Sequence, residues 1–198
     1  DGLLRQAAAN VPRIDWSHGR PALRLEPQRS NLVPWSSALS QWATSGATTA
    51  TDDALVLGAL SLALVEDADV AVMAFRHINV AFTGDGEKAV SCYVAAGTST
   101  TVELKLRDNT ASVDRLRASI TWAAGVPSVS MLTGTHLYTE PVGGGVYRLW
   151  FRSASVIAAN SHRVELFPAA GDVSNTGSVY VGGVQVENAV VPSSLIVT

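Results

Sequence analysis

The sequence has very little of the chemistry that fixes a fold covalently or through a metal ion. Cys92 is the only cysteine among 198 residues, which excludes an intramolecular disulfide framework and a zinc site built from cysteines. Because free cysteines are usually buried, Cys92 in "AVSCYVAA" is expected to be a small core residue rather than a nucleophile. The four histidines lie far apart, and none has a second ligand-type residue beside it at metal spacing.

Charge is also scarce, since only 16% of the residues are Asp, Glu, Lys or Arg and the formal net charge is −3. The 14 Lys and Arg are scattered, whereas a nucleic-acid partner needs a concentrated basic surface, so no nucleic acid is expected. The apolar runs 54–65 and 70–75 are separated by acidic residues and are shorter than a bilayer span of about 18 residues. Membrane insertion is therefore not expected.

Motifs of catalysis are missing as well. The chain has no G-x-S-x-G, H-E-x-x-H, Walker or G-x-G-x-x-G motif, and nothing singles out an acid–base pair among its 17 carboxylates. The sequence thus predicts that the chain is not an enzyme. The acidic clusters 66–69 and 52–53 could ligate a hard cation or simply form charged loops, and neither matches an EF-hand.

What the chain does have is a two-residue alternation of apolar and polar side chains, which is typical of strands. The stretch 101–108 puts aliphatic residues on one face and Glu103, Lys105 and Arg107 on a second face that is expected to be solvated. In 54–65, Gly58 favours a buried strand and its turn over a helix. About eight to ten strands are expected, and long amphipathic helices are missing, which predicts an antiparallel sandwich or barrel. The clearest further strands are 91–97, 114–122, 146–153, 162–169 and 178–188.

The start of the chain differs from the rest. The sequence predicts that residues 1–41 form an irregular arm packed on the sandwich, because prolines cannot donate the backbone hydrogen bonds that pair strands. Trp35 and Trp42 are expected to pin this arm. Residues 42–198 are expected to form the β-sandwich, and the length of the chain suits one domain overall. The prolines of the arm are Pro12, Pro21, Pro27 and Pro34.

Aromatic residues are the best candidates for ligand contact. In 146–153 the alternation puts Arg148, Trp150 and Arg152 on one face, which suits a glycan through stacking, cation–π contact and bidentate hydrogen bonds. Alternatively, Trp150 is a packing residue with the arginine stems folded over it. Trp122 shares its face with apolar residues and is assigned to the core.

Five blocks, taken in order, resemble a module of phage head-spike, tail-fibre and related virion proteins. They are "VPRIDW", "LRLEPQRSNLVPWSSALSQW", "AVSCYVAAG", "GGGVYRLWF" and "GSVYVGGVQVENAVVPSSLIVT", and they cover nearly the whole chain. The sequence departs from the pattern at Ser30, where Thr is common, at Val146, which replaces a Trp, and at Leu195, which replaces a Tyr.

The resemblance implies an all-β antiparallel sandwich of jelly-roll type, similar to carbohydrate-binding modules. It implies a non-catalytic module at the virion surface, in extracellular space, that binds host cell-surface polysaccharide and other virion chains. A homo-oligomer is compatible with such assemblies, although no heptad repeat is present. Two alternatives stay open: a purely structural or oligomerisation domain, and a sugar-binding module cut from a polysaccharide-degrading enzyme.

The resemblance also suggests a role for the polar residues of the arm. Glu26 and Arg29 are expected to form a hydrogen-bonded latch, with Gln185 and Glu187 of the last strand as partners. Some jelly-roll modules hold a structural calcium ion near the point where the termini meet. By that analogy Asn31 and Glu187 are metal candidates, and no other cofactor is expected.

Overall fold

The alternating pattern produces strands throughout the computed structural model, which describes residues 13–15, 22–24, 29–196 and 198. The described chain contains fourteen strands, more than the eight to ten expected. It also contains one short 3-10 helix, η1 (Leu39–Gln41). Strands β1 (Arg13–Asp15) and β2 (Ala22–Arg24) pair with each other. No helix of the described residues is long and apolar enough to cross a membrane.

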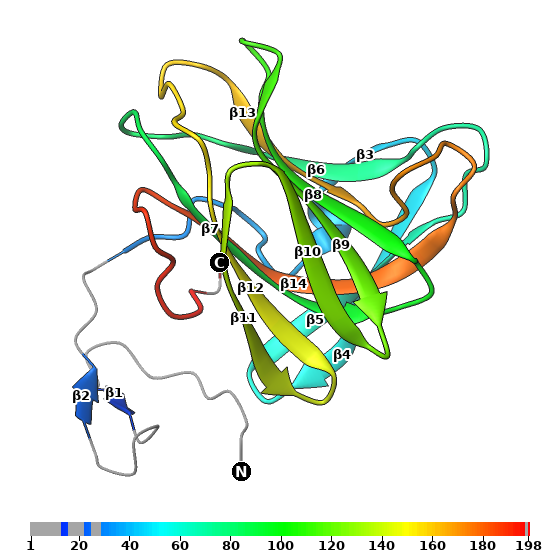
Figure 1. Cartoon of the computed structure of the whole chain (residues 1–198), viewed down its shortest axis with the longest axis horizontal. Coiled ribbons are helices and arrows are strands. Elements are labelled where there is room, and N and C mark those ends of the chain that lie inside the picture. Colours follow the sequence, from blue (N-terminus) through cyan, green and yellow to red (C-terminus); the bar gives the residue numbers. More distant parts are fainter. Residues whose placement is uncertain (1–12, 16–21, 25–28, 197) are drawn as a thin grey trace.

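The other twelve strands form two antiparallel sheets of six strands each, packed face to face (Figure 1). Sheet 1 contains, in spatial order, β10 (Val126–Thr133), β9 (Val113–Ala123), β8 (Thr101–Asp108), β13 (His162–Phe167), β6 (Phe75–Val80) and β3 (Ala43–Ser45). Sheet 2 contains β11 (Thr135–Gly143), β12 (Val146–Arg152), β7 (Ala89–Ala96), β14 (Gly177–Glu187), β5 (Leu60–Asp67) and β4 (Thr48–Leu57). The predicted antiparallel β-sandwich is confirmed.

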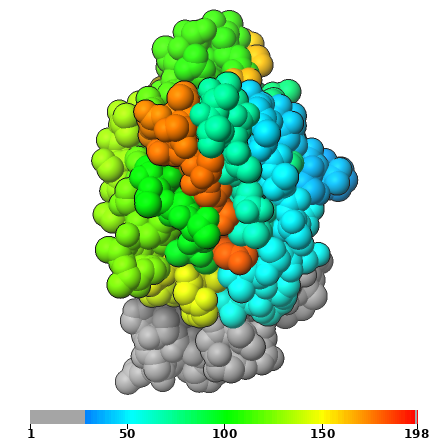
Figure 2. Space-filling model, turned by 90° about the vertical axis from the view of Figure 1, so that its right-hand side faces the viewer, coloured from blue at the N-terminus to red at the C-terminus, as the bar shows by residue number. Residues whose placement is uncertain are grey.

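The strand order is that of a jelly roll. The middle of sheet 2 runs β5-β14-β7-β12, and the middle of sheet 1 runs β6-β13-β8-β9, so the chain passes back and forth between the sheets. Strands β10 and β11 extend the two sheets at one edge, and β3 and β4 extend them at the other. Figure 2 shows part of this arrangement at the surface, where the orange end of β14 lies between green and cyan segments.

The core lies between the two sheets and consists of the inward-facing aliphatic and aromatic residues of both. Cys92 is buried in it, as expected, and burial raises the pKa of its thiol to about 12. Trp122 packs against the same core. The largest fully buried apolar side chains are Phe151, Leu39, Leu60, Leu62, Leu104, Leu106, Leu116, Ile120, Leu149 and Leu166.

The second face of β8 is partly solvated at Arg107 only, and the expectation was wrong for Glu103 and Lys105. Glu103 and Lys105 are only 6% and 8% exposed, although both point away from the core. The reason is that side chains from neighbouring strands pack over them: Arg117 of β9 contacts Glu103, and the ring of Phe167 of β13 lies against Lys105. Strand alternation shows which residues share a face, but it does not show what lies beside that face.

The apolar run 54–65 forms the turn and parts of both strands of the β4–β5 hairpin, with Gly58 in the turn at a φ of 63°. The strand-and-turn interpretation is therefore confirmed. Burial is concentrated in β5, because β4 is an edge strand and leaves Val56 largely exposed. Leu60 and Leu62 of β5 belong to a second apolar cluster on the outer face of sheet 2.

The described part of the arm runs beside the second half of β14. Leu32 N donates to Val186 O at 2.8 Å, and Val184 N donates to Ser36 O at 3.0 Å. Trp42 is buried in the core and pins the segment, as expected, whereas Trp35 is 53% exposed and does not. The pinning role expected of Trp35 was therefore wrong. Pro12, Pro21 and Pro27 lie outside the described residues.

Strand β14 changes register at Gly182 and Gly183, where β5 passes very close to it. A Cβ on Gly182 would lie 2.2 Å from Ser61 O of β5, so a larger residue must push the two central strands apart. We expect Gly182→Ala to destabilise the protein by about 1–3 kcal/mol, measured by urea unfolding. The control is Gly84→Ala, because nothing lies within 4 Å of a Cβ there, and a change below about 0.5 kcal/mol is expected. Equal losses in both variants would contradict the close approach.

Candidate functional site

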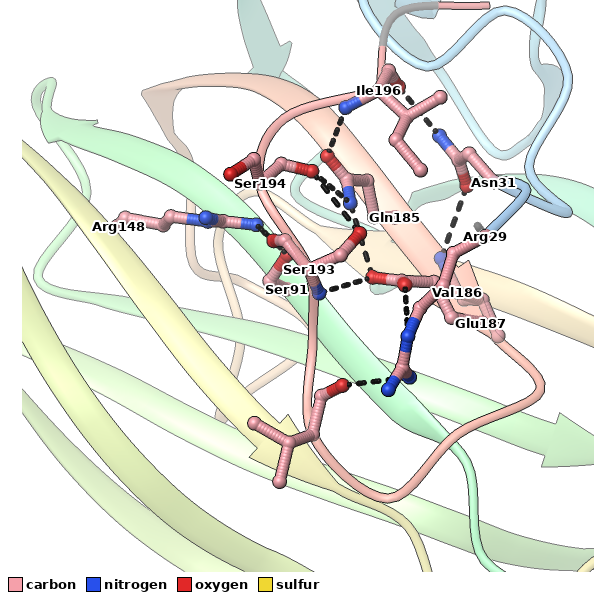
Figure 3. A network of polar contacts seen from close by, with 11 residues as sticks. Arg29, Asn31, Ser91, Arg148, Gln185, Val186, Glu187, Ser193, Ser194 and Ile196 are labelled. Carbon is pink, nitrogen blue, oxygen red and sulfur yellow. Dashed lines mark hydrogen bonds and ion pairs between the residues drawn. The ribbon is translucent and has the colours of Figure 1, made fainter. Parts of the chain in front are cut away.

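Residues of the second and last blocks meet in one polar network at the end of β14 (Figure 3). The side chain of Asn31 lies at its centre. Its Nδ2 donates to Val184 O at 2.9 Å and to Ile196 O at 3.3 Å, and its Oδ1 accepts from Val33 N at 3.0 Å and from Val186 N at 3.1 Å. One amide therefore joins the arm, β14 and the C-terminal segment.

Gln185 and Glu187 hold the C-terminal segment against the outer face of sheet 2. Gln185 Oε1 accepts from Ile196 N at 2.6 Å, and its Nε2 donates to Ser194 O at 3.2 Å and to Glu187 Oε1 at 3.1 Å. Glu187 Oε1 also accepts from Ser193 N at 2.9 Å. Both side chains are buried, so these bonds replace the water that the polar groups lose on folding.

Arg29 adds the positive charge to this network. Its Nε lies 4.0 Å from Glu187 Oε2, and its Nη1 donates to Val191 O at 3.1 Å. A buried carboxylate needs such a partner, because an unpaired charge is costly inside a protein. The structure therefore brings together Arg29, Gln185 and Glu187 of the predicted latch, while Glu26 lies outside the described residues.

The predicted metal ligands Asn31 and Glu187 belong to the same network. Asn31 Oδ1 accepts from two backbone amides, and Glu187 Oε1 accepts from Ser193 N and Gln185 Nε2. No group of three or more His, Cys, Asp or Glu that could hold a metal ion occurs among the described residues. Calcium prefers six to eight oxygen ligands, whereas here N–H donors take Asn31 Oδ1 and Glu187 Oε1, and Glu187 Oε2 faces the Arg29 guanidinium, so the donor set does not fit the ion.

Arg148 also serves the C-terminal segment rather than the surface. It is 4% exposed, and its Nη2 donates to Ser91 Oγ at 3.0 Å and to Ser193 O at 2.6 Å. Its guanidinium lies over the ring of Trp150 at 4.4 Å and over the ring of Tyr93 at 5.3 Å. A glycan arriving from solvent cannot reach an arginine buried in this way.

Arg152 is the arginine of the predicted glycan face that reaches solvent, and its Nε lies 3.7 Å from Glu87 Oε2. Arg148, Trp150 and Arg152 do share one face of β12, as the alternation predicts. However, Trp150 is a half-buried packing residue with the Arg148 guanidinium over its ring, which is the geometry of the alternative interpretation. This face presents little for a ligand to bind.

A different face carries a group of charged side chains that sequence reasoning did not bring together. On the outer face of sheet 1, Arg117 Nε donates to Glu103 Oε1 at 3.0 Å, and Lys105 Nζ lies 3.1 Å from Glu103 Oε2. On the neighbouring strand, Arg163 Nε donates to Glu165 Oε1 at 2.5 Å. Three cations thus face two carboxylates across β9, β8 and β13.

Aromatic rings lie among these charges. Lys105 Nζ is 4.1 Å from the centroid of the Phe167 ring, and the Arg163 guanidinium is 5.4 Å from that of Phe75. The two phenylalanine rings are themselves 4.6 Å apart, and His77 follows at 5.7 Å from Phe75. We call the set Phe75, His77, Glu103, Lys105, Arg117, Arg163, Glu165 and Phe167 the ladder face.

The ladder face is accessible at its two arginines. The side chains of Arg117 and Arg163 are 36% and 29% exposed, whereas the carboxylates that hold them are buried. Exposed guanidinium groups on a fixed aromatic and charged base can donate hydrogen bonds to hydroxyl or carboxylate oxygens. The alternation in 101–108 and 162–169 puts these residues on outward faces, but only the order β9-β8-β13-β6 makes them neighbours.

A second buried polar cluster ties together the loops at one end of the sandwich. Asp108 accepts from Arg115 Nη2 at 2.7 Å, from Asn160 Nδ2 at 2.9 Å and from Ala111 N at 2.9 Å, and His162 Nε2 lies 3.6 Å away. Burial favours a higher pKa for Asp108, but the hydrogen bonds and the nearby histidine outweigh it and hold the pKa well below its usual range. Both Asp108 and His162 are inaccessible, which makes the cluster a structural tie.

Burial disfavours the imidazolium and lowers the pKa of His162, and the Asp108 carboxylate opposes that shift only in part. The unfolded chain therefore takes up this proton more readily than the folded chain does. Protonation of His162 therefore leaves the free energy of unfolding unchanged above the ordinary histidine pKa of about 6.5 and lowers it as the pH drops below that value. We expect His162→Gln to flatten this decline in urea unfolding between about pH 7.5 and pH 5. An unchanged slope would show that His162 is not its source.

Comparisons with known proteins find similarity among solved structures. No protein-family model matches the chain, and no curated protein matches it. Among solved structures, the chain is similar to the enzymatically active domain of tailspike protein 4 of bacteriophage CBA120, with a TM-score of 0.48 and 13% sequence identity. The match covers 79% of this chain and 21% of that one, so the chain spans about a fifth of the length of that structure.

Proposed function

We propose that this chain is a non-catalytic carbohydrate-binding module of a phage-type virion spike or fibre. It recognises host surface polysaccharide through the ladder face of sheet 1. The virion context is supported by the five blocks in the sequence, and the sugar-binding role is supported by the chemistry of that face. The jelly-roll order of the strands agrees with both but does not by itself assign a function.

The observation that carries the proposal is the mixture of rings and charged donors across the four neighbouring strands β9, β8, β13 and β6. The part-exposed ring of Phe75, backed by the buried ring of Phe167, supplies flat apolar carbon, and Arg117 and Arg163 supply N–H donors on the same face. A sugar ring has an apolar C–H face and a rim of hydroxyls, so it needs both kinds of contact from the protein. A guanidinium carries five N–H donors, more than one carboxylate oxygen can accept, and donors are left for a ligand.

The ladder face is also pre-organised for binding. Glu103 fixes the side chain of Arg117, and Glu165 fixes that of Arg163, through short charge-assisted hydrogen bonds. A long side chain that is already held in place loses little rotamer freedom when a ligand arrives. The ion pairs therefore favour affinity as well as stability.

The same pairing favours binding over catalysis. A glycosidase acid needs surroundings that favour the neutral carboxyl group. Glu103 instead lies between Arg117 and Lys105, and Glu165 is bonded to Arg163, so positive charge surrounds both carboxylates. We therefore propose that the chain is not itself an enzyme.

A second candidate function is oligomerisation within the virion, and a specific observation favours it. Leu132 and Leu137 lie at register shifts in the edge strands β10 and β11, on either side of the crossover at Gly134, and both are exposed together with Tyr138. Bulges discourage edge pairing between strands, but exposed apolar side chains favour packing against another chain. A concentration-dependent dimer or trimer in sedimentation, lost in Leu132→Ser, would support this function.

The proposed function is tested on an array of bacterial capsule, lipopolysaccharide and algal polysaccharides, followed by calorimetry with any polysaccharide that binds. We expect Arg117→Ala and Arg163→Ala each to weaken binding about tenfold or more, because each removes charge-assisted hydrogen bonds. The matched control is Arg152→Ala, which removes an exposed, ion-paired arginine from sheet 2 and is expected to leave affinity unchanged.

Two outcomes would contradict the proposal. If no polysaccharide binds the wild-type chain, the sugar-binding function is wrong. If Arg152→Ala weakens binding and the ladder-face variants do not, the function stands but its site lies on sheet 2.

A further inference from the structure

The described tryptophans differ in how far their side chains are buried. Trp42 is buried, and Trp122 and Trp150 pack half-buried against the core and against Arg148 respectively. Trp35 is 53% exposed, although a tryptophan is the side chain that gains most from burial. Trp35 lies in the turn that precedes η1.

The backbone of Trp35 is strained as well. Its φ is 55°, in the left-handed region that costs a bulky L-residue free energy. The other described non-glycine residues with positive φ are small or prone to turns: Asp53, Ser112 and Ala124. Strain of this kind persists where the surrounding structure enforces it, and such positions concentrate at ligand sites.

The surrounding structure does hold Trp35 in this conformation. Its carbonyl accepts from Trp42 Nε1 at 3.1 Å and from Ala38 N at 3.2 Å. Val33, two residues before it, and Ser36, directly after it, are fully buried. The indole is therefore presented to solvent from a fixed backbone, and its own burial does not offset the strain.

Two consecutive hydrogen-bonded turns lead from Trp35 to Gln41, and they carry the polar side chains of Ser40 and Gln41. Ser40 N donates to Asp52 Oδ1 at 3.1 Å, Ser40 Oγ donates to Asp52 Oδ2, and Gln41 Nε2 donates to Ser40 Oγ at 3.4 Å. Arg76 lies beneath them, buried, and donates to the carbonyls of Ser40 and Leu39. The charge presented at the surface of this group is therefore the Asp52 carboxylate.

We propose that Trp35, Gln41, Ser40 and Asp52 form a second sugar subsite, separate from the ladder face, which takes a neutral pyranose. The indole stacks on the apolar face of the ring, and the amide, hydroxyl and carboxylate bond its hydroxyls. A neutral sugar fits because the Asp52 carboxylate repels an acidic one. This inference rests on the proposed glycan-binding function, and it names a second contact and the charge class of the residue that it recognises.

The test uses the intact chain labelled with 5-fluorotryptophan and the methyl glycosides of glucose, galactose, mannose and N-acetylglucosamine. The fluorine resonance of Trp35 is the one that disappears in Trp35→Asn, a variant whose new residue tolerates positive φ. We expect at least one glycoside to shift that resonance while those of the buried tryptophans stay in place. A Trp35 resonance that responds to none of them, or that moves only together with all the others, would overturn the subsite.

Variants separate a ligand role from a structural one. Trp35→Asn and Trp35→Gly relieve the strain, so their Tm should equal or exceed that of the wild type, while binding to the polysaccharide found on the array falls about tenfold. The matched control is Ala124→Gly, which relieves the same strain at an exposed turn and should leave binding unchanged.

The two proposals fail in different ways. Wild-type affinity in Trp35→Asn, together with loss of binding in Arg163→Ala, would refute the subsite and leave the proposed function standing. If the wild type binds no polysaccharide and no glycoside, both are wrong. If Trp35→Asn changes the oligomeric state instead of sugar binding, the exposed indole is a protein contact and the subsite is refuted.

Discussion

The structure depends on closing the open side of β14, the strand at the centre of sheet 2. Strand β5 pairs with β14 only as far as Val181, and beyond the shift at Gly182 the backbone groups of β14 on that side need other partners. Buried peptide groups without partners are costly. The backbone of the arm and the side chain of Asn31 supply these partners, and Asn31 also binds the C-terminal segment.

This closure joins the second and the last of the five sequence blocks. Arg29 and Asn31 of one block bond to residues of the other, in which Gln185 and Glu187 hold the C-terminal segment. These residues are occupied within the chain, and they specify how the jelly roll is completed. Contact with a ligand is thereby left to other side chains: the ladder face lies on sheet 1, and the indole of Trp35 is exposed although the adjacent Ser36 bonds to Val184 and Thr198.

The local part of the fold could be predicted from the sequence, and the long-range part could not. Alternation identified many of the longer strands and the shared face of Arg148, Trp150 and Arg152, because side chains of a strand alternate whatever its neighbours are. The burial of Arg148 depends on a C-terminal segment that is 45 residues away at Ser193. The ladder face likewise depends on the order of β9, β8 and β13, which no local pattern contains.

The most direct test of this closure is backbone amide hydrogen exchange of the intact chain at Val184 and Val186. Their amides donate to Ser36 O and to Asn31 Oδ1. We expect both amides to be protected as strongly as those in the centre of β7, and Asn31→Ala to reduce the protection of Val186 first, because protection follows the opening of the hydrogen-bonded unit. Exchange of Val184 and Val186 as fast as in the exposed turn 143–145 would contradict the account, because β14 would then be open on that side.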